Sequence, residues 1–161
     1  TIDDWAAYQP LSEQLDLDWK VVYLDKRQHL FGDVVHYYLS FIHYDREDEH
    51  SFARLQCLNR YGSLLPEKVL HTTFDRSQQE LQKHSYLFDP EYDKVFTELP
   101  VDHYRIDRLM INTKIKEALV IDYKTGGIHE EEQLDNYVKA LQRIPAFSGY
   151  SFISKYVMLN I

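Results

Sequence analysis

Two oppositely charged residues stand two positions apart at the end of an apolar run. The stretch "ALVIDYKTGG" covers residues 118–127 and carries Asp122 and Lys124 just before a Thr-Gly-Gly turn. Successive side chains of a β-strand point to opposite faces, so we expect these two to point the same way and Ile121 and Tyr123 to point the other way. The stretch therefore predicts a carboxylate and an ammonium group presented together.

Two further acidic residues precede this pair. Asp107 lies in "YRIDRLMI" and Glu98 in "FTELPV". A hairpin turning near residues 113–116 would bring Asp107 beside Asp122, with Glu98 on a neighbouring strand. Clustered carboxylates repel one another and resist ionising together unless a cation binds. Oxygen ligands completed by water suit Mg²⁺ or Mn²⁺, so the pattern predicts a metal site.

The chemistry expected of such a site is phosphodiester hydrolysis. Lys124 beside a metal-bound water could orient and deprotonate that water and stabilise charge on a phosphate oxygen. His36, from an early helix, could add a nitrogen ligand or hold a second metal ion. Gln133 and Tyr137 are four residues apart, hence on one face of a helix, and could hold the lysine or a phosphate.

Each residue taken alone also has a structural interpretation. An aspartate two residues before a lysine is more often a surface ion pair than a catalytic dyad. Asp107 would more often pair with Arg105 or Arg108, and His36 on an apolar helix would more often be a satisfied core histidine. A solvated glutamine, a core tyrosine and a strand-end acid are the corresponding interpretations of Gln133, Tyr137 and Glu98. Their joint occurrence, in this order, favours a site.

The helices that must position these residues follow from apolar spacing. We expect a helix from Phe31 to about Ile42, with Asp33 as its N-cap, carrying His36. Residues 1–30 predict a short helix followed by an extended segment. Polar, helix-permissive sequence between residues 48 and 88 predicts two or three more helices.

The second half of the chain predicts a sheet. Alternation over 94–101, 104–112 and 118–124 predicts three adjacent strands, with a hairpin joining the second and third. An apolar stripe over 130–144 predicts a helix, and the β-rich segment 150–161 predicts a last strand that returns to the sheet after a crossover. The expected fold class is α/β, a mixed sheet flanked by helices with an N-terminal helical segment.

Composition limits the class of protein. The chain has 161 residues, 44% of them hydrophobic, which predicts a single domain. It contains no apolar run of the ~18–20 residues that a membrane span needs, so we expect no membrane association and a cytoplasmic location. Cys57 is the one cysteine, which excludes a four-cysteine iron–sulfur cluster within this chain. The net charge of −8 argues against a free-standing nucleic-acid binder.

The motif series resembles a known family. In order, "GDVVH", "TELPV", "RIDRLMI", "ALVIDYKTG" and "QLDNYVKAL" are similar to the motifs of RecB-type nucleases in the PD-(D/E)XK superfamily, especially the C-terminal nuclease domain of AddA/RecB-like, UvrD-type helicase-nucleases. The resemblance covers residues 31 to about 142 and implies a restriction-endonuclease-like core over about 31–161 of one domain, 1–161. It implies metal ligands at His36, Asp107 and Asp122, a catalytic Lys124 and an accessory motif formed by Gln133 and Tyr137. Glu98 matches a less uniformly placed acid and is a weaker candidate ligand.

The resemblance also implies an activity and partners. The chain would be a Mg²⁺- or Mn²⁺-dependent exodeoxyribonuclease domain that processes DNA ends, with single strands as substrate, in recombination and repair. It lacks the GxxxxGK[ST] loop, so an ATPase motor would lie elsewhere in a longer helicase-nuclease or in a second nuclease/helicase subunit. Neighbouring domains could then supply the basic channel that the acidic charge of this chain does not. Two alternatives stay open: a catalytically silent nuclease-like module that guides DNA or contacts a partner, and a domain in which the Asp-Lys pair is purely structural.

Overall fold

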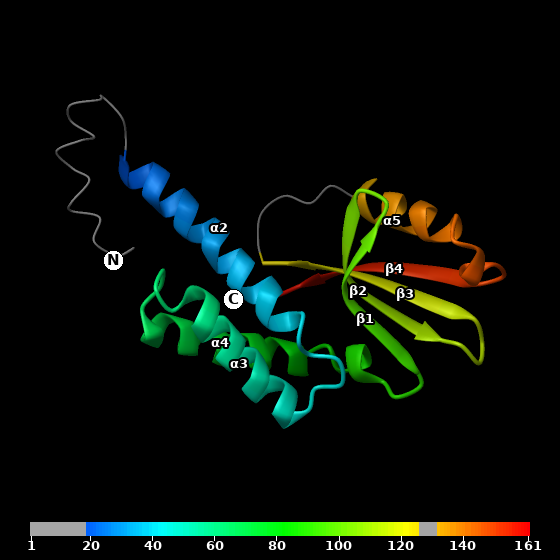
Figure 1. Cartoon of the computed structure of the whole chain (residues 1–161), viewed down its shortest axis with the longest axis horizontal. Helices are drawn as coiled ribbons and strands as arrows, with labels where there is room; N and C mark the ends of the chain where they lie inside the picture. Colours follow the sequence, from blue (N-terminus) through cyan, green and yellow to red (C-terminus); the bar gives the residue numbers. More distant parts are fainter. Residues whose placement is uncertain (1–18, 126–131) are drawn as a thin grey trace.

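Three helices precede a four-stranded sheet in the computed structural model, which describes residues 19–125 and 132–161 (Figure 1). The helical elements are α2 (Trp19–Leu39), α3 (Glu47–Tyr61), α4 (Glu67–Gln82), the 3₁₀ turn η2 (Ser85–Phe88), α5 (Glu132–Gln142) and the 3₁₀ turn η3 (Pro145–Phe147). The strands are β1 (Lys94–Val101), β2 (Tyr104–Asn112), β3 (Glu117–Lys124) and β4 (Ser151–Met158). The predicted α/β class, its strands and the two or three helices between residues 48 and 88 are confirmed.

The sheet has the order β1-β2-β3-β4. The first three strands are antiparallel neighbours, with Thr97 opposite Arg108 and Arg108 opposite Ile121. β4 runs parallel to β3, and α5 forms the crossover between them. Both the predicted hairpin at 113–116 and the predicted return of the last strand are confirmed, and the acidic strands are therefore adjacent.

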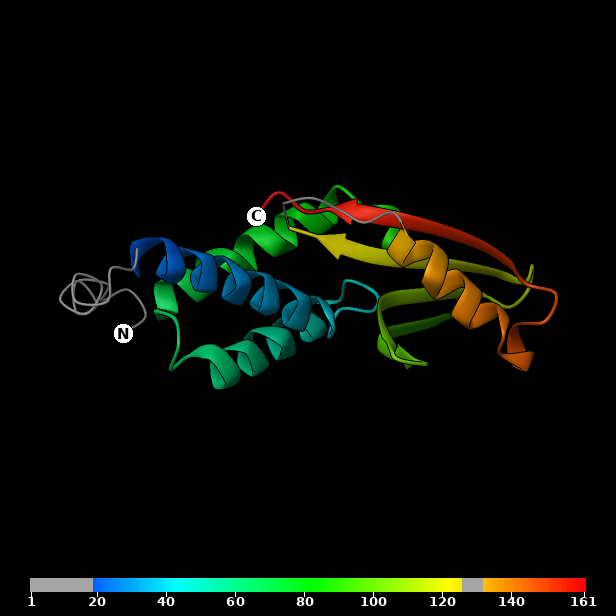
Figure 2. The same cartoon turned by 90° about the horizontal axis from the view of Figure 1, so that it is seen from above.

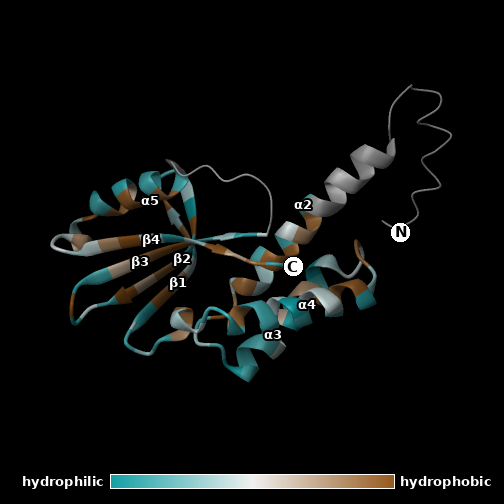
Figure 3. Ribbon diagram, turned by 180° about the vertical axis from the view of Figure 1, so that it is seen from behind, coloured by the Kyte–Doolittle hydropathy of each residue, from teal (hydrophilic) through white to brown (hydrophobic). Residues whose placement is uncertain are grey.

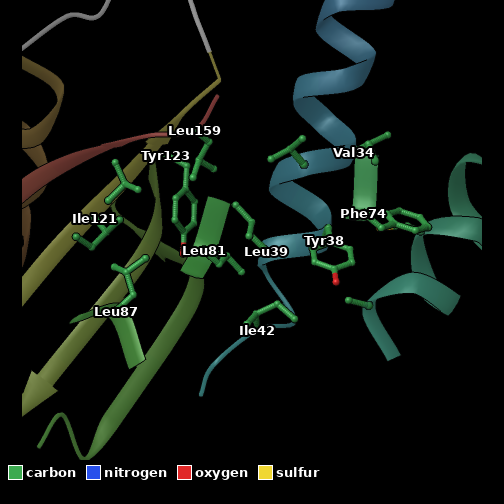
Figure 4. Packing of buried hydrophobic residues seen from close by; sticks show 14 of the residues in the cluster. Val34, Tyr38, Leu39, Ile42, Phe74, Leu81, Leu87, Ile121, Tyr123 and Leu159 are labelled. Atoms are coloured by element: carbon green, nitrogen blue, oxygen red, sulfur yellow. The ribbon is translucent and has the colours of Figure 1, made fainter. Parts of the chain in front are cut away.

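Each face of the sheet has its own hydrophobic core. Helices α2, α3 and α4 pack on one another beside the sheet, and their core continues onto one face of it, whereas α5 lies along the other face (Figure 2). Figure 4 shows the first core, in which Val34, Tyr38 and Leu39 of α2 lie between Phe74 of α4 and residues Ile121 and Tyr123 of β3. In the second core, Leu134 and Leu141 of α5 lie against Leu109 and Val120. Hydrophobic residues recur along the strands and α2, whereas α3 and α4 show many hydrophilic ones (Figure 3).

One charged side chain is buried in the first core. Arg108 is fully buried, and its guanidinium donates to the backbone carbonyls of Ile42 and His43, both at 2.6 Å, and of Leu87 at 2.7 Å. Its Cζ also lies 5.1 Å from the ring centre of Phe88. The carbonyl groups just beyond the C-terminus of α2 carry the negative end of that helix, which suits a cation. Arg108 thus ties strand β2 to the segments that follow α2 and α4.

The first helix differs from its prediction. α2 begins at Trp19, so residues 20–24 are helical rather than extended, and Asp33 lies inside the helix instead of capping it. The helix ends at Leu39, before the predicted end at Ile42. Gly32 lies within the helix, close to the end of β3: a Cβ there would lie 3.7 Å from the Thr125 hydroxyl. A glycine at a close approach can interrupt a sequence pattern without interrupting the helix.

Some predictions fall outside the described residues. These are the elements expected over residues 1–18, the turn at Gly126 and Gly127, and the first two residues of the helix predicted from 130. Within 19–125 and 132–161, no helix is long and apolar enough to cross a membrane.

Candidate functional site

All seven residues singled out in the sequence meet at the C-terminal end of β3, between α2 and α5. Five elements supply them: α2, β1, β2, β3 and α5. The His36 ring lies 3.2 Å from the Asp107 carboxylate and the Lys124 ammonium 2.9 Å from that of Asp122. Lys124 also donates to Gln133 at 3.2 Å. Residues far apart in the sequence thus form one connected polar cluster.

Asp107 sits where β2 and β3 separate. The last backbone pair between these strands joins Arg108 to Ile121. Beyond it the Asp107 carboxylate accepts the backbone N–H of Tyr123 at 2.8 Å and so replaces the next rung of the ladder. The interpretation in which Asp107 pairs with Arg105 or Arg108 is wrong, because Arg108 points into the opposite core.

His36 faces only hydrogen-bond acceptors. Its Nδ1 lies 2.9 Å from the Gly32 carbonyl, one turn earlier in α2, and its Nε2 lies 3.2 Å from both Asp107 Oδ2 and the Tyr123 carbonyl. Burial alone would lower the pKa of His36. The hydrogen bond and charge of Asp107, with smaller help from Gly32 and Glu98, outweigh burial and raise this pKa to about 9. His36 is therefore a half-buried histidine with partners on both ring nitrogens, and its charged partner is an acid of the cluster.

The three carboxylates share negative charge in a confined space. Burial, followed by the neighbouring Asp107, raises the pKa of Asp122 to about 6. Burial and Asp107 also raise the pKa of Glu98. Burial acts in the same direction on Asp107, but its hydrogen bond to His36 prevails and lowers its pKa. One acid thus remains readily ionised while the other two resist ionisation.

Asp122 carries a poorly satisfied oxygen. The residue is only 4% exposed, and its Oδ2 has no hydrogen-bond partner in the described structure. Its charged partner is the Lys124 ammonium, 2.9 Å away. A buried carboxylate oxygen left in this way is a ready ligand for an additional cation.

Glu98 is placed by an unusual backbone. Its φ is 50°, in the left-handed region, in the middle of β1. It lies between the paired residues Thr97 and Leu99, whose register sets it opposite Asp107. A non-glycine residue in this region costs on the order of 1 kcal/mol and is often found at functional sites. Arg105, 3.6 Å away, is the basic partner of Glu98 rather than of Asp107.

The lysine is held by a short relay from α5. Gln133 donates its amide N–H to the Tyr137 hydroxyl at 2.6 Å, which turns its carbonyl oxygen toward Lys124. Burial, with the charges of Asp122 and Asp107, raises the pKa of Tyr137 to about 12, so its hydroxyl keeps its proton. The Tyr156 ring also borders the Lys124 ammonium, with its centre 5.7 Å away. Gln133 is therefore hydrogen-bonded within the cluster rather than only solvated. Tyr137 is a buried aromatic residue whose hydroxyl also orients Gln133.

The donor set fits a hard divalent cation by chemistry. The carboxylates of Asp107 and Asp122 and the Tyr123 carbonyl supply the oxygen ligands that Mg²⁺ and Mn²⁺ prefer. Within residues 19–125 and 132–161, no three His, Cys, Asp or Glu side chains already form a ligand group. His36 and Lys124 engage the carboxylates instead. Binding a cation would require small side-chain rotations that exchange these contacts for metal bonds.

Two contributions to the cluster come from backbone groups that the sequence-based prediction missed. The N–H and carbonyl of Tyr123 contact Asp107 and His36, and the Gly32 carbonyl fixes the His36 ring. The signal for Gly32 was its position four residues before His36 on a helix. Comparison with protein-family models, with curated proteins and with solved structures finds no match to this chain. Its function is therefore inferred from the geometry of the cluster and from the motif resemblance.

Proposed function

We propose that this chain is a metal-dependent DNA nuclease domain with a restriction-endonuclease-like core, and that it hydrolyses phosphodiester bonds. One observation carries the proposal. Asp107 and Asp122, with Lys124 in contact with the second of them, lie together at the end of β3 in an arrangement with surplus carboxylate charge. An arrangement that costs folding energy but would bind a cation well is typical of a catalytic site.

The residues that would hold the metal can be named. Asp107 and Asp122 would be ligands, Glu98 a weaker one, and His36 a nitrogen ligand in its neutral form. The bond between His36 Nδ1 and the Gly32 carbonyl selects the tautomer whose Nε2 is free for a metal. A bound Mg²⁺ or Mn²⁺ would supply Lewis acidity at the phosphate and lower the pKa of a water molecule.

Lys124 has the position expected of the catalytic lysine. It lies at the site-facing end of β3, and its side chain is 23% exposed, so a water molecule or a phosphate can reach it. The Gln133–Tyr137 relay limits where its ammonium can point. As an ammonium group, Lys124 would orient the attacking water and stabilise charge on the phosphate oxygens; to take up the proton of that water it would first have to release its own.

The biological setting proposed here comes from the motif resemblance. The domain would process DNA ends, as an exonuclease on single strands, within a longer helicase-nuclease or beside a second helicase/nuclease subunit. The alternative is a nuclease-like module that guides DNA or contacts a partner without cleavage.

A cleavage assay separates these functions. End-labelled single-stranded DNA is incubated with the protein in Mg²⁺, Mn²⁺ or EDTA. Lys124→Ala is compared with Lys155→Ala, a lysine of the same sheet that lies over the Tyr86 ring. We expect metal-dependent cleavage that falls about 10²–10³-fold in Lys124→Ala and stays unchanged in Lys155→Ala.

Calorimetry with Mn²⁺ resolves a negative result. If no lane shows cleavage but Mn²⁺ binds and Asp122→Ala abolishes its binding, the site is competent and needs a motor to deliver DNA. If Mn²⁺ does not bind at all, the catalytic proposal is overturned in favour of a guiding or structural module.

A further inference from the structure

A groove of about 880 Å³ lies between α2 and α4 and reaches the acidic cluster. His36 and Thr125 line it at the end of β3. The α2 wall is built from residues at helical spacing that include Gly32, Asp33 and His36, and the α4 wall from residues that include Lys68, Thr72 and Arg76. The groove therefore meets the acidic cluster at His36, whose ring contacts Asp107.

Basic residues mark the α4 wall. Lys68, Thr72 and Arg76 recur every four residues, so they lie in a row on one face of the helix, and all three are exposed. At 1.5 Å per residue, the two cations are separated by ~12 Å along the helix axis. The row runs along the groove, with the small Thr72 between the two long side chains.

The two cations in this row lack the acidic partners that neighbouring basic residues have. Arg54 pairs with Asp75 at 2.9 Å, and Lys83 pairs with Glu80 at 3.0 Å. No carboxylate in the described parts of the chain pairs with Lys68 or Arg76. An unpaired lysine or arginine that faces a groove is available for a ligand anion.

The groove has the opposite charge to the rest of the chain. Among the described residues that line it, Asp33 is the one acidic residue, against Lys68 and Arg76, while the chain as a whole carries a net charge of −8. A positively charged groove on an acidic protein raises the local concentration of a polyanion in that groove and not elsewhere on the surface. The single strand proposed above as the substrate is such a polyanion, and duplex DNA is its competitor in the test below.

We propose that the α2–α4 groove is the path by which a single strand of nucleic acid enters the site, with Lys68 and Arg76 contacting its backbone phosphates. This inference rests on the proposed nuclease function, because it supplies the substrate path to the same cluster. It also accounts for nucleic-acid binding by an acidic chain without a partner's basic channel.

Fluorescence anisotropy with a labelled single-stranded oligonucleotide tests the path in EDTA, over a range of salt concentrations. The double variant Lys68→Gln/Arg76→Gln is compared with Lys94→Gln/Lys114→Gln, which removes the same charge from exposed positions on β1 and the β2–β3 hairpin. Each phosphate contact contributes about 0.7 to the slope of log K against log salt for a single strand. We expect the groove variant to bind about tenfold more weakly at low salt and to lose about 1.4 from that slope.

The outcomes distinguish the path from the catalytic proposal. An unchanged slope in the groove variant, no measurable binding by the unaltered chain at low salt, or an equal loss in the control variant overturns the path. Duplex DNA that competes as well as the single strand overturns the single-strand assignment. EDTA removes metal-dependent turnover, so this binding test is independent of cleavage. A changed salt slope in the groove variant supports the path even if no cleavage is found. Cleavage together with an unchanged salt slope supports the proposed nuclease function but not the path.

Discussion

Two chains of polar side chains start from positions two residues apart on α2, and they are built differently. In the first, the Tyr38 hydroxyl donates to His50 Nδ1 at 2.7 Å, and His50 Nε2 donates to Asp45 at 2.6 Å. In the second, His36 contacts Asp107, next to Asp122 and Glu98. Both chains contain a histidine–aspartate pair, but only the second crowds several carboxylates together.

The difference separates a pair that completes a structural network from one that belongs to the proposed site. His50 is buried, and each of its ring nitrogens has one partner of the opposite kind, so the first chain is complete. The second chain gives His36 only acceptors and leaves an Asp122 oxygen without a hydrogen bond. A complete network stabilises the fold, whereas an incomplete one retains the capacity to bind something else.

Asp122→Asn should have the largest effect on the second chain. It removes a ligand of the proposed metal site, so on the proposed function metal-dependent cleavage should fall about 10²–10³-fold or more. It also relieves the repulsion with Asp107, so the melting temperature in EDTA at pH 7.5 should rise. Asp45→Asn, in the first chain, should leave cleavage unchanged. Equal cleavage by Asp122→Asn and the unaltered protein would contradict the assignment of the metal site.

His50→Ala, in the first chain, should lower stability and leave cleavage unchanged. It leaves a cavity and removes the partners of the Tyr38 hydroxyl and of Asp45, so the free energy of unfolding should fall by about 3 kcal/mol. Urea denaturation measures this loss. Cleavage per folded molecule should be unchanged, and a loss of activity in fully folded protein would show that the first chain also serves the site.

The pH dependence of stability should distinguish His36 in the metal-free protein. Its pKa is about 9 in the folded state and near 6.5 when unfolded, so its protonated form contributes stability below pH 6.5 that is lost as the pH rises through 9. We expect the difference in unfolding free energy between the unaltered protein and His36→Gln, measured in EDTA, to be larger at pH 6 than at pH 10. A difference that does not change with pH would mean that the His36–Asp107 pair carries no charge.

Removing single hydroxyls should give the smallest effects. Tyr137→Phe takes away the acceptor that orients Gln133, so the cleavage rate should fall by roughly 3–10-fold, in line with one neutral hydrogen bond. Tyr38→Phe should instead lower the unfolding free energy by about 1 kcal/mol and leave cleavage unchanged. If both variants changed only stability, the relay from α5 would be structural.

Short-range patterns in the sequence predicted much of this arrangement. Alternation over 118–124 placed Asp122 and Lys124 on one face, and the four-residue spacing of Gln133 and Tyr137 placed them together on α5. Pairing of adjacent antiparallel strands then brought the acids together. These features depend on periods of two and 3.6 residues, which a sequence displays directly.

Long-range contacts and backbone strain were not accessible in this way. Asp107 taken alone suggested Arg105 or Arg108 as its partner, but the partner is His36, and this contact depends on how α2 packs against the sheet. The positive φ of Glu98 has no marker such as glycine. The start of α2 was missed because the interior of a long helix, with a glycine and an aspartate in sequence, resembles a helix start.

Arg108 has a consequence for how the molecule comes apart. Its guanidinium donates to carbonyls on two segments of the helical half, and it neighbours Asp107 in the same strand. Pulling the helices from the sheet would break these hydrogen bonds to a charged group all at once, which is costly. Opening should therefore have no low-energy intermediate. Native-state hydrogen exchange should then give the most protected amides of α4 and β2 the same free energy of opening, as for a single cooperative unit. The acidic cluster, which weakens the fold locally, then belongs to a structure whose helices and sheet unfold together.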